Sequence, residues 1–119
     1  MTIDIPPGQK HDPNRKSYLA NLFVAGLQYY DALEVWAELK IGTKLTLEPE
    51  PTNPYDRHAI RVLHNGRMLG YLPRNENRHM AKLLNAGWNP YELLVQGLYE
   101  QQPMNERLEV CIRVLPFGA

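Results

Sequence analysis

Residues 50–62 read EPTNPYDRHAIRV, a polar segment rich in turn formers that continues directly into a strand. Proline fixes φ and disfavours helical geometry in the residue before it, so Pro51 and Pro54 stiffen this loop. We expect the loop to hold Tyr55 and Asp56 in fixed positions. A stiff polar loop of this kind either forms a binding site or serves only as an Asx-type turn that begins the next strand.

Strand patterns lie on both sides of this loop. Residues 44–48 alternate between polar and apolar side chains and lead into it, as in a half-buried strand. Residues 59–64 and 67–72 flank Asn65-Gly66, the strongest short-range signal for a two-residue hairpin with a type I′ turn. Pro73 ends the second strand of this predicted hairpin.

The rest of the chain predicts three more strands and little helix. Residues 18–26 are typical of a buried strand that ends at a glycine with backbone freedom, and residues 32–40 favour a helical turn over an irregular connection. Residues 76–86 predict a helix capped by Asn75 and closed by Gly87. The last two strands are expected at residues 91–100 and 108–115.

This pattern predicts a mostly β fold, a small antiparallel barrel or sandwich with one or two short helices packed beside it. A chain of 119 residues fits one domain, which we place at residues 18–119, with a flexible N-terminal arm at residues 1–17. Cys111 is the only cysteine, so no disulfide framework is expected. Neither a signal peptide nor a membrane span is predicted, and we expect a cytoplasmic protein with no membrane partner.

Charge is balanced overall but uneven along the chain. Thirteen basic and thirteen acidic residues cancel, which argues against a polycationic, indiscriminate nucleic-acid binder. Residues 57–82 nevertheless carry six basic side chains against one acid, Glu76. This stretch is either a solvated face or an anion-binding surface. Its basic members are Arg57, Arg61, Arg67, Arg74, Arg78 and Lys82.

Binding chemistry is better supplied than catalytic chemistry. The phosphate-loop, nucleophile-elbow and zincin motifs are all missing from the sequence. Aromatic side chains interleaved with arginines suit a single-strand binder or a peptide-binding barrel. Glu48, Glu50 and Asp56 offer carboxylates for Mg²⁺, a weak signal for a metal-dependent phosphodiesterase, and we expect no cofactor or metal. The tyrosines are Tyr29, Tyr30, Tyr55 and Tyr71.

Four motifs together resemble a HIRAN domain. They are VAGLQYY at residues 24–30, EPTNPYDRHAIRV at residues 50–62, Asn65-Gly66, and GYLP at residues 70–73. The match in order and spacing runs from about residue 23 to about residue 97. The resemblance implies a modified OB-like β barrel with a helix packed beside it. It also implies single-stranded DNA binding at a free 3′ end, as in a fork-remodelling member of the family.

The resemblance implies roles for particular residues. Tyr29 and Tyr30 match tyrosines that stack on or border the terminal nucleotides. Asn53, Tyr55 and Asp56 match the loop that receives the 3′-hydroxyl. Gln28 departs from the arginine of the DNA-binding relative, which removes one phosphate contact. The expected DNA-binding set, including our own additions from the residues alone, is Tyr29, Tyr30, Asn53, Tyr55, Asp56, Arg57, Tyr71, Arg74 and Arg78.

The leading hypothesis is therefore a non-catalytic domain that recognises 3′ ends of single-stranded DNA in repair or replication restart, beside a helicase or another repair protein. Two alternatives stay open. A peptide-interaction module would use the same barrel groove, and the zero net charge and Gln28 favour it. A metal-dependent phosphodiesterase is the third hypothesis and the least favoured.

Overall fold

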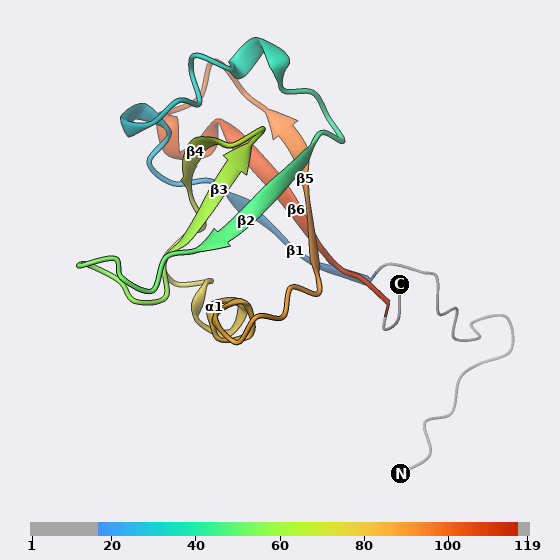
Figure 1. Ribbon diagram of the computed structural model, residues 1–119. Helices are drawn as coiled ribbons and strands as arrows, with labels where there is room; N and C mark the ends of the chain where they lie inside the picture. Colours follow the sequence, from blue (N-terminus) through green and yellow to red (C-terminus); the bar gives the residue numbers. More distant parts are fainter. Residues whose placement is uncertain (1–16, 117–119) are drawn as a thin grey trace, which may run out of the picture.

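The computed structural model describes residues 17–116, which form one curled antiparallel sheet and one α-helix (Figure 1). The strand order is β1-β6-β5-β2-β3-β4. The prediction of a mostly β, OB-like barrel is confirmed. The strands are β1 (Ser17–Phe23), β2 (Lys44–Pro49), β3 (Ile60–His64), β4 (Arg67–Tyr71), β5 (Tyr91–Leu98) and β6 (Leu108–Val114), and the helix is α1 (Arg78–Asn85). The predicted arm at residues 1–17 lies outside the described residues, except for Ser17.

The sheet curls until its two ends meet. Immediately after β1, the backbone N–H of Ala25 donates to the carbonyl of Tyr71 at 2.8 Å, and the N–H of Tyr71 donates back at 2.9 Å. This approach requires a glycine at position 70, because a Cβ there would overlap the carbonyl oxygen of Ala25 and lie 2.8 Å from Val24 Cγ1. One antiparallel bridge thus joins the segment that follows β1 to β4, the strand at the other end of the sheet.

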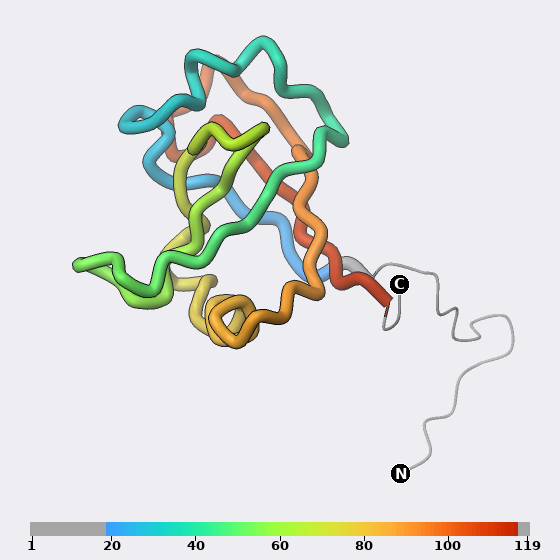
Figure 2. Tube along the Cα trace, in the orientation of Figure 1, coloured from blue at the N-terminus to red at the C-terminus, as the bar shows by residue number. Residues whose placement is uncertain are grey.

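The core fills the inside of this curled sheet. Side chains from β3, β4, β5 and β6 are fully buried, among them Ile60, Leu69, Leu93 and Ile112. Helix α1 lies across one end of the barrel and packs Met80, Ala81 and Leu84 into the same core (Figures 1 and 2). The helix is therefore held by one apolar face, and its other face is free for solvent or a ligand.

Local predictions around the loop are largely confirmed. Asn65 (φ 49°) and Gly66 (φ 79°) both have positive φ, as a type I′ hairpin turn requires. The helical turn expected within residues 32–40 is a short 3₁₀ helix, Trp36–Glu38. Gly87 (φ 86°) closes α1, and the N–H of Trp88 bonds to the carbonyl of Leu83, as in a Schellman motif.

The predicted start of the helix was wrong. The chain first makes a turn, in which the N–H of Glu76 bonds to the carbonyl of Pro73, and the first helical bond runs from Ala81 to Asn77. Asn77 therefore occupies the N-cap position instead of Asn75, and its side chain makes no capping bond. Within residues 17–116, no helix has the length and apolar character needed to cross a membrane.

Gly70→Ala tests the closure of the barrel. Overlap with the Ala25 carbonyl must push the two chain segments apart, so we expect a loss of about 1–3 kcal/mol in the free energy of unfolding. Hydrogen exchange should also speed up at the amides of Ala25 and Tyr71. Urea unfolding and exchange followed by NMR measure the two effects.

The control is Gly42→Ala, where an added Cβ meets no neighbouring atom but φ is 89°. We expect this control to lower stability through backbone strain without selective loss of protection at Ala25 and Tyr71. Unchanged stability and protection in Gly70→Ala would contradict the role assigned to this glycine.

Candidate functional site

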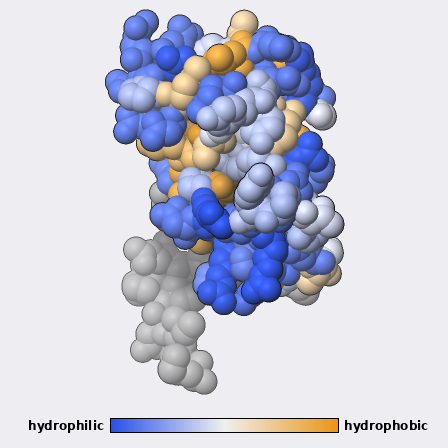
Figure 3. Space-filling view, turned by 90° about the vertical axis from the view of Figure 1, so that its left-hand side faces the viewer, coloured by the Kyte–Doolittle hydropathy of each residue, from blue (hydrophilic) through white to orange (hydrophobic). Residues whose placement is uncertain are grey.

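A pocket of about 460 Å³ opens where the loop after β2, the end of β4 and the segment before α1 meet. The space-filling view shows apolar surface exposed between hydrophilic regions on the side of the molecule that carries this loop (Figure 3). The pocket is lined by Ala25, Tyr30, Glu50, Asn53, Pro54, Tyr55, Asp56, Ala59, Tyr71, Leu72, Arg74 and Asn77.

Asn53 organises the loop from within. Its Oδ1 accepts the backbone N–H of Tyr55 at 2.9 Å and that of Asp56 at 3.1 Å, which is an Asx-type turn. Its Nδ2 donates to Glu50 Oε1 at 2.7 Å. The Asx turn is confirmed, and the same turn forms one wall of the pocket, while a binding role for the loop stays a prediction.

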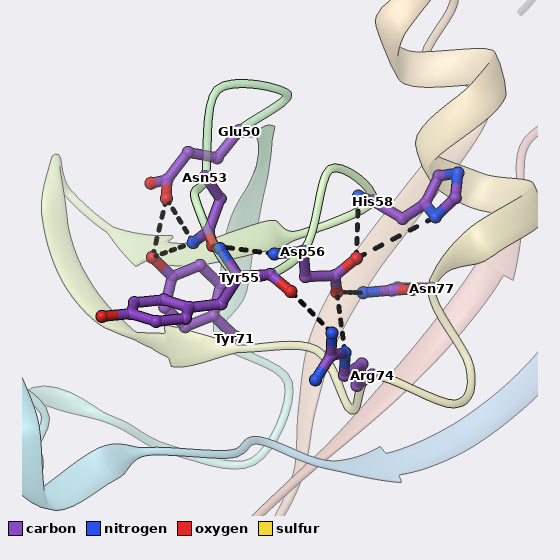
Figure 4. Close-up of polar contacts among 8 residues, drawn as sticks. All are labelled: Glu50, Asn53, Tyr55, Asp56, His58, Tyr71, Arg74 and Asn77. Carbon is purple, nitrogen blue, oxygen red and sulfur yellow. Dashed lines mark hydrogen bonds and ion pairs between the residues drawn. The ribbon is translucent and has the colours of Figure 1, made fainter.

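Asp56 lies at the centre of a second set of contacts, all drawn in Figure 4. Its Oδ1 accepts the backbone N–H of His58 at 2.9 Å, and its Oδ2 accepts Asn77 Nδ2 at 3.0 Å. The bond from Asn77, the bond from His58 and the nearby Arg74 lower the pKa of the Asp56 carboxyl, and their effect outweighs the desolvation that opposes it. The carboxylate is therefore ionised at neutral pH and can accept further hydrogen bonds.

Tyr71 and Tyr30 form an aromatic corner of the pocket. Their rings meet edge to face, with centroids 5.7 Å apart at an interplanar angle of 74°. The Tyr71 hydroxyl donates to Glu50 Oε1 at 2.9 Å. Desolvation, followed by the bonds to Glu50 and Tyr30, raises the pKa of Tyr71 to about 12, so the hydroxyl stays protonated and neutral.

Six of the nine predicted DNA-binding residues line this pocket, and three lie outside it. Tyr29 is 76% exposed, and Arg57 and Arg78 are exposed on the loop and on α1. Tyr30 is 37% exposed, so neither of these adjacent tyrosines is buried. Tyr29 ends a 3₁₀ helix, Leu27–Tyr29, that begins after Gly26 at φ 78°. The six predicted residues that line the pocket are Tyr30, Asn53, Tyr55, Asp56, Tyr71 and Arg74.

Arg74 bridges the loop and the segment before α1. Its Nη2 donates to the backbone carbonyl of Tyr55 at 2.6 Å, and its Nε lies 3.9 Å from Asp56 Oδ2. Because three quarters of the side chain remains exposed, the guanidinium can still contact an anion at the mouth of the pocket.

Two polar pocket residues were not in the predicted binding set. Asn77 is buried and gives its amide to Asp56, although an asparagine before a helix normally indicates a cap. Glu50 was considered only as a metal ligand, whereas it accepts bonds from both Asn53 and Tyr71. The position of Glu50 between two prolines was the only available signal that its side chain is held in place.

Two arginines of the basic stretch were misjudged. Arg61 contacts Glu48 at 2.6 Å and Glu50 at 3.4 Å, and Arg67 is bound by Asp31 and Glu34. These guanidinium groups are neutralised within the fold, so residues 57–82 do not form one continuous anion-binding surface. Arg61 also occupies two of the three carboxylates that the phosphodiesterase hypothesis needs. No group of three or more His, Cys, Asp or Glu side chains is arranged for a metal ion within the described range.

Asn77→Ala tests the support of Asp56. A carboxyl with a lowered folded pKa stabilises the fold above its unfolded pKa, near 3.8, and this contribution is lost as the pH falls through the folded pKa. We expect the variant to lose about 1–3 kcal/mol of unfolding free energy at neutral pH. The difference in unfolding free energy between the variant and the parent should become smaller below pH 4. Urea unfolding at pH 7 and pH 3 measures both values.

The matched control is Asn75→Ala, which removes an exposed amide two residues away and should change stability little at either pH. Asn77→Ala could instead lower the free energy of unfolding by the same amount at both pH values. That result would show that Asn77 acts by packing alone.

The chain is similar to known proteins over most of its length. The HIRAN domain profile matches residues 17–114. Two plant proteins named Fanconi-associated nuclease 1 homologue match, one from Oryza sativa subsp. japonica at 34% identity over 90 residues and one from Arabidopsis thaliana at 30% over 94 residues. These alignments cover 72% and 78% of this chain but only 9% and 10% of the plant proteins.

Solved structures agree with the fold. A crystal structure of a Lactobacillus plantarum protein superposes with a TM-score of 0.72 at 28% identity, covering 86% of this chain and 97% of that one. The HIRAN domain of human HLTF superposes with a TM-score of 0.64 at 23% identity, covering 82% and 74% respectively. With the family profile matched across nearly all of the described residues, this chain belongs to the HIRAN domain family.

Proposed function

We propose that this domain is a non-catalytic binding domain that takes the 3′ end of single-stranded DNA into the pocket beside Asp56. The observation that carries the proposal is the ionised, hydrogen-bonded Asp56 carboxylate that lines a pocket with exposed aromatic side chains. Membership of the HIRAN family and the likeness to two nuclease homologues support a nucleic-acid ligand.

Asp56 would recognise the chemistry of the strand end. An ionised carboxylate accepts a hydrogen bond from a 3′-hydroxyl but repels a 3′-phosphate. Asn77 and the His58 backbone each take one lone pair of the carboxylate, and each oxygen retains another lone pair for a ligand. The pocket would therefore prefer an unmodified end.

Tyrosines would supply affinity that does not depend on base sequence. Tyr30 is 37% exposed and Tyr55 is 83% exposed, and both line the pocket. Stacking of a base on an aromatic ring contributes about 1–3 kcal/mol. Tyr29, which lies next to Tyr30 and is open to solvent, offers a further surface for the penultimate base.

A domain of this size would act as an end-recognition unit for a separate enzymatic activity. The chain spans about a tenth of the length of the plant relatives that it matches. We infer that it works beside a helicase, nuclease or other repair enzyme, and we place this work in repair or replication restart.

Fluorescence anisotropy with three labelled single strands tests the proposal. The strands carry a 3′-hydroxyl, a 3′-phosphate, or no end because they are circular. We expect tight binding only of the 3′-hydroxyl strand. Asp56→Ala should weaken it at least tenfold, because a charged hydrogen bond worth about 1.5–3 kcal/mol is lost. Tyr30→Ala should weaken all linear strands.

The matched control is Glu76→Ala, which removes one exposed negative charge outside the pocket. General electrostatics predicts that losing an acid strengthens DNA binding, so weaker binding by Asp56→Ala alone points to a specific contact. Equal binding of all three strands, with no effect of Asp56→Ala, would refute end recognition.

A peptide-binding function is the second candidate. The zero net charge favours it, as does Gln28, which stands where the DNA-binding relative has an arginine. It predicts weak DNA binding that changes little with salt. Phosphate contacts instead make the logarithm of the affinity fall with the logarithm of the salt concentration, in proportion to the number of contacts.

A further inference from the structure

The solvent face of α1 is basic. Arg78, His79 and Lys82 are exposed, while Met80, Ala81 and Leu84 are buried on the opposite face. The helix contains no acidic residue between Arg78 and Asn85. We call Arg78, His79 and Lys82 the α1 basic face.

This face begins beside the pocket. Asn77, the residue before the helix, lines the pocket and bonds to Asp56 at 3.0 Å. Arg78 is the first helical residue, and Lys82 follows one turn later, about 6 Å further along the helix axis. The first turn of α1 therefore adjoins the pocket.

The cations on this face differ from the lysine and arginines that form ion pairs elsewhere within residues 17–116. Arg61, Arg67 and Lys44 each pair with at least one carboxylate. Arg78 and Lys82 form no ion pair with any residue between 17 and 116, and both are exposed. Their charges are thus available to an external anion instead of being neutralised by the fold.

We propose that the α1 basic face binds internal phosphates of the single strand whose 3′ end occupies the pocket. This inference rests on the proposed function and extends it from an end pocket to a backbone contact. Charge complementarity identifies the occupant, because two unpaired cations one helical turn apart, with no acid between them, suit a phosphate chain. In this arrangement the pocket supplies base stacking and end recognition. The phosphate contacts to α1 make the affinity increase with the length of the strand.

The experiment compares two ligands, a dinucleotide that reaches only the pocket and a twelve-nucleotide strand, both ending in a 3′-hydroxyl. The variant is Arg78→Gln/Lys82→Gln. NMR titration measures dinucleotide binding, and anisotropy over a series of salt concentrations measures the longer strand. For the long strand we expect the salt slope to fall by about 1.4, since each lost single-strand phosphate contact contributes about 0.7. Dinucleotide affinity should stay within twofold of the parent.

The matched control is Lys40→Gln/Lys44→Gln, which removes the same charge before and at the start of β2, at the opposite end of the barrel from α1 (Figure 1). This control should keep the parent salt slope. Thermal melting confirms that both double variants fold. Replacing internal phosphates of the long strand by neutral methylphosphonates should remove the difference between the parent and Arg78→Gln/Lys82→Gln.

The outcomes separate the two claims. A parent that binds the dinucleotide, with an unchanged salt slope for the long strand in Arg78→Gln/Lys82→Gln, overturns the α1 contact and leaves end recognition intact. A parent that binds neither ligand overturns both. An equal loss of slope in the two double variants overturns the α1 contact in favour of a general charge effect.

Discussion

Two backbone hydrogen bonds between Ala25 and Tyr71 join the ends of the curled sheet, and the pocket depends on them. They bring the segment after β1 against the end of β4, which places Tyr30 beside Tyr71. Gly70 permits this approach because any side chain at that position would collide with the Ala25 carbonyl. A constraint on backbone packing thus creates the aromatic side of the pocket.

The polar side of the pocket depends on Asp56, which connects the loop to the helix. Its carboxylate is held by the loop backbone at His58 and by Asn77 at the start of α1. Because α1 is also anchored through its apolar face, the loop and the basic face of the helix keep a fixed relation. A ligand that enters the pocket would meet both elements without a large rearrangement.

Much of the fold follows from local pattern. Asn65-Gly66 predicts the hairpin because both residues accept positive φ, and Gly87 predicts the helix end for the same reason. The helix start was misplaced because two asparagines, Asn75 and Asn77, are equally good caps in sequence. A local turn bond from Glu76 to Pro73 precedes the helix, and the Asn77 side chain bonds to Asp56 across 21 residues, a contact that local sequence does not reveal.

By itself, the sequence determined the strand pattern, the stiff loop at residues 50–62 and, through its motifs, the family. These features depend on neighbouring residues, whose φ preferences and side-chain alternation act locally. Only the tertiary structure decided which charges remain available. Arg61 meets Glu48 across 13 residues and Arg67 meets Asp31 across 36, whereas Arg78 and Lys82 pair with no described residue. Such pairing depends on how the sheet curls and where the helix packs. No local pattern in the chain encodes which charged side chains these arrangements bring together.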